Sequence, residues 1–198
     1  MELLIIRHGQ SEADILKRLE GRADFELTDL GKIQAKSMAD WVNNNYKPDY
    51  ILSSTLKRAR QTAEILESRV KLKTQYSDEL MEFNNGLVAG LTLEEADTRF
   101  PLPKDKKPHD SFYEQETLIE FRARAETIFS KIVHGFPNDK RVAVVSHGNM
   151  INMLFRCFLE LPLTSNVSIH TADTGIHLWR VSPGNRQIVF LNSTTHLA

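Results

Sequence analysis

The chain has 198 residues, of which 41% are hydrophobic and 26% charged, a composition typical of a folded globular protein and not of a disordered or fibrous one. Its formal net charge of −1 provides no global field for attraction to nucleic acid or an anionic membrane, so we expect neither as a partner. The single Cys157 excludes an internal disulfide and, because its neighbours are apolar, is expected to be a buried thiol. Cytoplasmic localisation is the corresponding expectation, since no apolar run is long enough for a signal peptide or a membrane span.

The N-terminal part of the chain predicts a strand, a loop and a helix. Residues 2–6 form an apolar run typical of a buried strand, and residues 7–27 are polar, irregular and glycine-bearing, as a loop should be. Thr28 is a candidate N-cap, and the helix that follows it should end at Asn43-Asn44-Asn45. The apolar residues at helical spacing in this helix are Leu30, Ile33, Met38, Trp41 and Val42.

The middle of the chain predicts two further strands and two helices. Tyr50-Ile51-Leu52 is typical of a buried strand, Thr55 is the predicted cap of the next helix, and a third strand is expected around residues 71–76. Thr92–Arg99 predicts a short helix. Residues 101–108 carry three prolines and three lysines, so we expect them to form a surface excursion without regular structure.

The C-terminal part predicts two helices and three strands. Residues 117–120 form a capping box, Thr-x-x-Glu, at the start of a long helix. Val142–Val145 is the clearest buried strand, and an apolar helix should follow it to Leu159. Residues 176–181 and 187–191 predict two final strands joined by a turn.

Strands that alternate with helices predict an α/β protein. We expect a mostly parallel central sheet with helices on both faces and an antiparallel hairpin at its edge. Residues 1–198 should form one domain with a small lid-like excursion at about 91–117. Such sheets bind ligands beyond the carboxyl ends of their strands, so a functional site is expected there.

Three polar clusters begin where predicted strands stop. They are Arg7-His8-Gly9, Ser53-Ser54-Thr55 with Arg58, and Ser146-His147-Gly148. Because the carboxyl ends of parallel strands meet at one edge of a sheet, these clusters should share one pocket. Two histidines, two arginines and backbone amides suit a phosphoryl group, since the planar guanidinium fork matches phosphate oxygens bidentately.

His8 is the candidate nucleophile of this pocket, because a neutral imidazole can attack phosphorus. Arg58 should lie in the first turn of its helix, where free N–H groups also favour an anion. Gly9 and Gly148 would let the backbone approach the ligand without obstruction by a side chain.

Glu82 is the candidate general acid for the leaving oxygen. It lies between apolar neighbours, and a desolvated carboxyl can hold a proton at neutral pH. Asp78 and Glu79 are rivals that look like solvated loop acids. No histidine pair has the helical spacing of zinc ligands, so we expect no metal site.

Five ordered motifs of the chain resemble those of the histidine phosphatase superfamily, also called the phosphoglycerate mutase-like family. They are LIIRHGQSEAD, GRADFELTDLGKIQA, SSTLKRARQTAEI, LMEFNNGLVAGLT and VVSHGNMI, with ADTGIHLW as a weaker echo. The resemblance implies a three-layer α/β/α fold, phosphorylation of His8, and no metal or organic cofactor. It also implies that Arg7, Arg58 and His147 bind the phosphate, and that Glu82 protonates the leaving group and then helps to activate water.

Two residues depart from the pattern of that family. Asp14 stands where relatives often have an asparagine that holds the phosphate, and Asp173 stands near another frequent asparagine. A carboxylate that pointed inward would repel a dianion, so Asp14 either turns away or selects a substrate with a positive or hydroxyl-rich portion. The pocket wall is expected to include Gly21, Arg22, Phe83, Asn84, Leu87 and parts of residues 100–117.

The reaction that we expect is hydrolysis of a phosphomonoester, with a small phosphorylated metabolite as substrate. Asn149 is instead associated with mutases, but the short segment at 91–117 is less able to shield a phosphoenzyme than the larger mutase insertions. A phosphoglycerate mutase that uses the same residues is therefore the alternative. A non-catalytic phosphate-binding protein, suggested by Asp14 and Asp173, is a second alternative. The substrate and the oligomeric state stay open.

Overall fold

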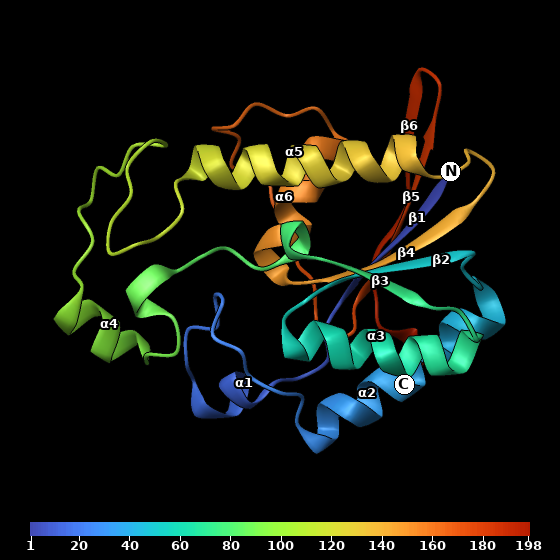
Figure 1. Ribbon diagram of the computed structural model, residues 1–198, viewed down its shortest axis with the longest axis horizontal. Helices are drawn as coiled ribbons and strands as arrows, with labels where there is room; N and C mark the ends of the chain where they lie inside the picture. Colours follow the sequence, from blue (N-terminus) through green and yellow to red (C-terminus); the bar gives the residue numbers. More distant parts are fainter.

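A six-stranded mixed sheet forms the centre of the protein, which a computed structural model describes over residues 1–198 (Figure 1). The strand order is β3-β2-β4-β1-β5-β6, in which β1 to β4 are parallel and β5 and β6 are antiparallel additions at one edge. The predicted α/β class, with a mostly parallel sheet and an antiparallel edge, is therefore confirmed. The strands are β1 (Glu2–Arg7), β2 (Tyr50–Ser54), β3 (Thr74–Ser77), β4 (Arg141–Ser146), β5 (Ile176–Ser182) and β6 (Asn185–Ser193).

Helices cover both faces of this sheet, as Figure 1 shows. α2 (Asp29–Asn45) and α3 (Lys57–Val70) pack on one face, and α5 (Leu118–Gly135) and α6 (Gly148–Phe158) pack on the other. Two short helices, α1 (Glu12–Leu16) and α4 (Leu93–Arg99), lie at the end of the molecule toward which the parallel strands run.

The core follows from the alternation of side chains along the central strands. In β1, Leu3 and Ile5 join the apolar cluster under α5 and α6, whereas Leu4 and Ile6 join the cluster under α2 and α3. Cys157 is buried in the first cluster as expected, and burial raises the pKa of its thiol to about 12. The sheet is thus sealed on both faces, which leaves its strand ends as the place for polar chemistry.

Most predicted helix caps are confirmed, but the start of α3, the helix α1 and the apolar face of α2 differ from the prediction. Thr28 accepts a hydrogen bond from the Gly31 N–H at 2.9 Å. α3, in contrast, begins at Lys57 with Leu56 as its N-cap residue and has no side-chain cap. The predicted cap, Thr55, lies one residue earlier, and its hydroxyl donates to Asp78 at 2.6 Å. α1 was not expected; it begins in the predicted loop, with a capping box formed by Ser11 and Asp14. The expected apolar face of α2 was also partly wrong, since the exposed fractions of Leu30 and Ile33 are 50% and 59%.

Two glycines allow α2 to pack against the backbone that follows the first strand. A Cβ on Gly9 would lie 2.5 Å from the Gly31 carbonyl oxygen, and one on Gly31 would lie 2.1 Å from the Gln10 carbonyl oxygen. Gly9 is therefore required for helix packing, a reason different from the close ligand approach that the sequence suggested. At Gly148, a Cβ would meet no heavy atom within 4 Å.

Replacement of Gly31 by alanine should consequently overpack this contact. We expect the free energy of unfolding in urea to fall by about 1–3 kcal/mol, because backbone atoms cannot move aside as a side chain would. Gly135→Ala is the matched control, since a Cβ at Gly135 in α5 meets nothing within 4 Å. Equal stability of the Gly31→Ala variant and the control would show that α2 does not need this close approach.

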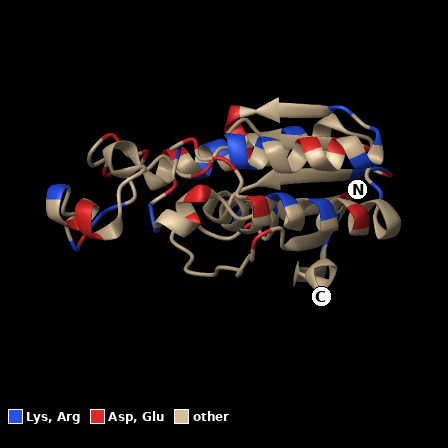
Figure 2. Ribbon diagram, turned by 90° about the horizontal axis from the view of Figure 1, so that it is seen from below, with Lys and Arg blue, Asp and Glu red and all other residues tan.

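Charged side chains of both signs are interspersed along the helices (Figure 2). None of the helices combines the length and the apolarity needed to cross a bilayer.

Candidate active site

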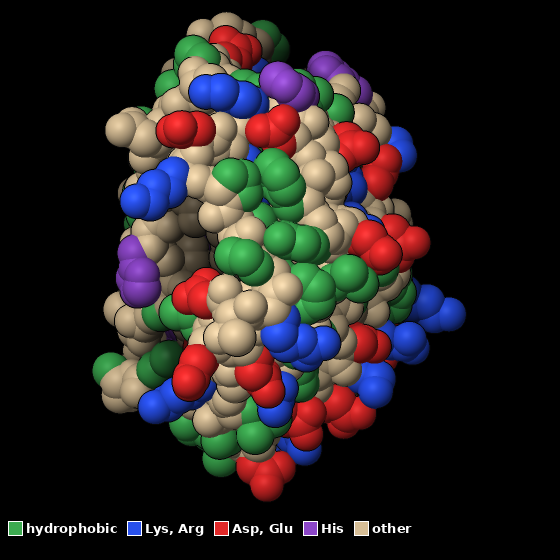
Figure 3. All heavy atoms as spheres, turned by 90° about the vertical axis from the view of Figure 1, so that its left-hand side faces the viewer, with side chains coloured by type: hydrophobic (Ala, Val, Ile, Leu, Met, Phe, Trp, Pro, Cys, Tyr) green, Lys and Arg blue, Asp and Glu red, His purple; other side chains and the backbone are tan.

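The parallel register brings the predicted polar clusters to one edge of the sheet. Arg7 of β1 pairs with Ser146 of β4, and Ser54 of β2 pairs with Ser77 of β3. The residues that follow these strand ends therefore meet, and the ring centroids of His8 and His147 are 5.1 Å apart. Figure 3 looks onto this end of the molecule, where apolar side chains gather beside a hollow bordered by basic, acidic and histidine side chains.

His8 is fully buried, and its hydrogen bonds define the state of its ring. Its Nδ1 lies 2.8 Å from the Gly9 carbonyl oxygen, which can only accept, so Nδ1 carries the hydrogen. In the neutral ring the lone pair is then on Nε2, and the Arg58 Nε–H donates to this nitrogen at 3.2 Å. The nitrogen that carries the lone pair therefore faces a guanidinium.

Arg58 is also fully buried, in the first turn of α3, where the sequence placed it. Its two terminal nitrogens donate to the carbonyl oxygens of Ala23 at 3.0 Å and Gly21 at 2.9 Å. Gly21 has a φ of +48°, a conformation that suits glycine, so the segment after α1 can turn its carbonyls toward the guanidinium. The fork of Arg58 is fixed in one orientation beside His8.

His147 presents the second imidazole at the end of β4. Its Nε2 lies 2.8 Å from the Ser54 hydroxyl oxygen, and its Nδ1 is buried without a hydrogen-bond partner in the protein. Burial, followed by the positive charge of Arg58, holds the pKa of His147 well below its usual range. The ring is therefore neutral at neutral pH, with one nitrogen available to a ligand.

Glu82 is buried at the N-terminus of α6, where His147 provides no side-chain cap. Its Oε1 accepts from the N–H groups of Phe83 at 2.8 Å and Met150 at 3.1 Å, and its Oε2 accepts from Asn149 at 3.0 Å. The carboxyl group is thus held at the same edge of the sheet as both histidines, and its charge acts on Arg58.

The rival carboxyl groups have other partners. Asp78 accepts from Thr55, and Glu79 forms an ion pair with Lys131 at 2.8 Å. Asp14 is exposed, and its Oδ2 accepts from the backbone N–H of Ser11 at 2.8 Å. Of the two possibilities for Asp14, the geometry favours a side chain turned toward the cap of α1.

Arg7, at the end of β1, is half-buried. Its guanidinium donates to the Thr171 carbonyl oxygen at 3.0 Å and lies 3.5 Å from Asp173. Burial raises the pKa of Asp173 above its ordinary value, Arg7 opposes this effect, and the charge of Asp14 adds to it. The ion-pair distance thus makes Asp173 a direct neighbour of Arg7, the predicted phosphate ligand.

The buried His177 contacts Thr171, the residue whose carbonyl oxygen accepts from Arg7. Its Nδ1 accepts from the Asn192 N–H at 3.1 Å, so Nε2 carries the hydrogen and donates to the Thr171 hydroxyl at 3.0 Å. Burial lowers the pKa of His177 to about 4. The Thr171 carbonyl, in turn, is the acceptor for Arg7.

The stability of the folded protein should therefore depend on pH through His177. The unfolded chain takes up a proton near the ordinary pKa of 6.5 and the folded protein only at about 4, so the unfolded state binds more protons between these values. We expect the free energy of unfolding in urea to be about 2–3 kcal/mol lower at about pH 4.5 than at pH 7 on account of this residue. His177→Gln should lose that much less stability over the same range; equal losses would contradict the assignment.

Three residues that the sequence did not single out complete the site. Thr62 in α3 accepts from the Gly9 N–H at 3.2 Å. Arg124 in α5 donates to the carbonyl oxygens of Glu79, Met81 and Glu82, and so fixes the segment that carries the candidate acid. Glu20 lies 3.6 Å from His8 Nε2 and 3.3 Å from Arg58 Nε. Glu20 directly precedes Gly21 in the second motif, which is the one signal that could have indicated it.

A second ionic cluster, centred on Glu116, contacts two residues of the expected pocket wall, Arg22 and Asn84. Glu116 pairs with Arg124 at 2.6 Å and lies 3.8 Å from Arg22, and it accepts from the Asn84 N–H at 2.6 Å. Leu87 is about half exposed, and its N–H donates to the Tyr113 carbonyl oxygen. The end of the 91–117 excursion is therefore tied to the segment that carries the candidate acid.

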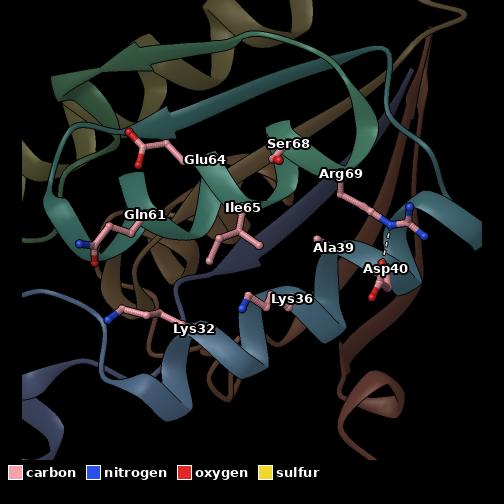
Figure 4. A pocket seen from close by; sticks show the side chains of 9 residues that line it. All are labelled: Lys32, Lys36, Ala39, Asp40, Gln61, Glu64, Ile65, Ser68 and Arg69. Carbon is pink, nitrogen blue, oxygen red and sulfur yellow. Dashed lines mark ion pairs between the residues drawn. The ribbon is translucent and has the colours of Figure 1, made fainter.

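A separate surface groove, with a volume of about 560 Å³, lies between α2 and α3 and is away from the strand ends (Figure 4). Its lining mixes lysines and acids that are largely solvated, and Arg69 is already paired with Asp40. The buried constellation around His8, and not this groove, is the candidate active site.

Comparisons with known proteins identify the family of the chain. A family model described as histidine phosphatase superfamily (branch 1) matches residues 3–194. The uncharacterized phosphatase PhoE of Bacillus subtilis is 32% identical over 151 residues, which cover 76% of this chain and 73% of that protein. Glucosyl-3-phosphoglycerate phosphatase of Mycobacterium tuberculosis is 30% identical over 173 residues, covering 82% of this chain and 77% of its own.

Solved structures give the same result for the fold. A mycobacterial glucosyl-3-phosphoglycerate phosphatase in complex with VO3 superimposes with a TM-score of 0.83 at 26% identity, covering 97% of this chain and 98% of that one. Mutase relatives exist as well: the probable phosphoglycerate mutase GpmB of Proteus mirabilis is 28% identical over 167 residues, covering 82% and 76% of the two chains. The family and the fold predicted from the motifs are confirmed, and the phosphatase interpretation is better supported than the mutase interpretation.

Proposed function

Because the chain belongs to the histidine phosphatase superfamily, we propose that it hydrolyses phosphomonoesters through a phosphohistidine formed on His8. The observation that carries this proposal is the state of His8: the Nδ1–H is held by the Gly9 carbonyl, and the lone pair of Nε2 faces Arg58. A nucleophile needs a lone pair in a fixed orientation, and the geometry supplies it; the Arg58 Nε–H must leave Nε2 when the phosphorus approaches.

In the first step, His8 Nε2 attacks phosphorus while the bond to the leaving oxygen breaks. Arg58, Arg7 and Nδ1 of His147 would bind the phosphoryl oxygens and stabilise their charge. Glu82 at the N-terminus of α6 would protonate the leaving oxygen. In the second step, the same carboxylate would accept a proton from water as the water attacks the phosphohistidine, which returns the enzyme to its starting state.

A small phosphorylated metabolite is the proposed substrate. The relatives are named for substrates of this kind, glucosyl-3-phosphoglycerate among them. Arg22 and the segment at Phe83 and Asn84 lie next to the site and could contact the non-phosphate part. None of the side chains in the proposed mechanism requires a metal or an organic cofactor.

Product analysis separates the proposed hydrolysis from mutase action. With 3-phosphoglycerate and a panel of phosphomonoesters, we expect release of inorganic phosphate and little formation of 2-phosphoglycerate. Isomer formation faster than phosphate release would instead favour the mutase alternative, for which the relatives named as mutases are the supporting observation.

A further inference from the structure

Glu20 occupies the space beside the attacking nitrogen, a position that the proposed mechanism leaves unexplained. One of its carboxylate oxygens lies 3.6 Å from His8 Nε2; the other accepts from the Ser11 hydroxyl at 2.5 Å and lies 3.3 Å from Arg58 Nε. Its side chain is only 16% exposed. The carboxylate is therefore held in place from three elements, β1, α3 and the start of α1.

A phosphoryl group that reacts with His8 must become a direct neighbour of this carboxylate. Reacting atoms need to approach within about 3–3.5 Å, and Glu20 lies about that far from the same nitrogen. Two anionic oxygens at such a distance repel each other unless a proton lies between them.

The surrounding charges do not compensate for a phosphate dianion. Arg58 has Glu20 as a neighbour and Arg7 has Asp173, so each guanidinium that would bind phosphate already faces a carboxylate. A monoanion brings half the charge of a dianion, and it carries a P–OH group that can donate to Glu20.

Glu20 itself does not supply the missing proton. Burial raises the pKa of Glu20, but a protonated His8, the charge of Arg58 and the Ser11 hydroxyl lower it below its usual range; when His8 is neutral, Arg58 and Ser11 still favour the carboxylate. The groups that face it from other elements are thus His8, Arg58 and, at longer range, Asp173. The proton must arrive on the substrate.

We propose that Glu20 is a specificity-determining residue that makes this site select the monoanion of a phosphomonoester, whose P–OH donates a hydrogen bond to the Glu20 carboxylate. The inference rests on the proposed phosphatase function. The P–OH proton stays between the phosphoryl group and Glu20 during transfer to His8, while Glu82 protonates the leaving oxygen. Wild-type activity is therefore shifted toward acidic pH.

The test compares kcat/KM of wild type and Glu20→Gln from about pH 5 to about pH 8. Glutamine keeps an oxygen for Ser11 and adds an N–H that can donate to a dianion. Because a phosphomonoester loses its second proton near pH 6, the ratio of variant to wild type should rise about tenfold for each pH unit above that value. A phosphomonoester with a more acidic second ionisation should move the start of this rise to lower pH.

Two results would overturn the proposal. A ratio that is constant with pH would mean that Glu20 only positions Arg58 or moves aside when substrate binds. A ratio that is highest at low pH would mean that Glu20 acts only by stabilising the protonated ring of His8.

Controls separate this proposal from the function on which it rests. Glu12→Gln, on the exposed surface of α1, should match wild type at every pH, and Glu20→Ala removes the charge in a second way if the glutamine variant fails to fold. Inhibition by inorganic phosphate should weaken with rising pH more in wild type than in Glu20→Gln. Absence of phosphomonoester hydrolysis by wild type at all pH values would reject the phosphatase function, whereas hydrolysis with a flat ratio rejects only the role of Glu20.

Discussion

Replacement of His8 by alanine is expected to lower kcat/KM for phosphomonoester hydrolysis by about 10⁵–10⁶-fold, the loss typical of a removed covalent nucleophile. No other group can take over: Nε2 of His147 accepts from the Ser54 hydroxyl, so that its partnerless Nδ1 carries the hydrogen and has no lone pair, and Glu82 is held by backbone N–H groups of α6. The loss should appear in kcat and not in KM, since Arg58 and Arg7 would still bind the phosphate.

The measurement is steady-state hydrolysis of para-nitrophenyl phosphate, with His134→Ala as the matched control. His134 is exposed on α5, so its removal should leave kcat and KM unchanged. A His8→Ala variant that keeps more than about a tenth of the activity would exclude covalent catalysis at this residue. Equal inactivity of wild type and variant would support the non-catalytic phosphate-binding alternative.

Replacement of Arg58 should reduce both activity and stability. Its guanidinium touches His8 Nε2, the Glu20 carboxylate and two carbonyl oxygens while it is fully buried. Arg58→Ala removes charge stabilisation of the phosphoryl group, for which we expect a loss of about 10³-fold in kcat/KM. It also leaves Glu20 without its cationic partner, so the free energy of unfolding should fall by about 3 kcal/mol.

Arg58→Lys distinguishes geometry from charge. A lysine keeps the positive charge but cannot donate to His8, Gly21 and Ala23 in the planar arrangement of a guanidinium, so most of the activity should stay lost. Arg60→Ala is the matched control, because Arg60 is 57% exposed on the same helix and pairs only with Glu64 and Tyr76. Recovery of near wild-type kcat/KM in Arg58→Lys would contradict the bidentate role.

The fold and the main site residues could be predicted because their signals are local. Apolar runs identify β1, β2 and β4, and the residue after each run is placed by the strand itself. Once the strands are parallel, His8, Arg58 and His147 must converge. Thr28 and Thr117 cap their helices as predicted, because a cap involves residues only three positions apart.

The residues that were missed act through contacts between distant segments. Glu20 meets His8 and Arg58 only after the segment that follows α1 turns back over the strand end. Thr55 has a side chain suited to a helix cap, but α3 begins one residue later than predicted, after Leu56, and the Thr55 hydroxyl donates to Asp78 instead. For Gly9, the sequence correctly indicated a close approach and could not say that the neighbour is Gly31 of α2.

Direct detection of the phosphoenzyme tests the central claim. Wild-type protein mixed with a ³²P-labelled phosphomonoester and quenched within the first turnover should carry label that is lost in acid and retained in alkali, on the peptide that contains His8. His8→Ala should carry no label. With a labelled ester whose leaving group needs no protonation, such as para-nitrophenyl phosphate, Glu82→Gln should accumulate label, because His8 is still phosphorylated while attack by water is slowed. Hydrolysis at the full rate without label on His8 would contradict the phosphohistidine mechanism.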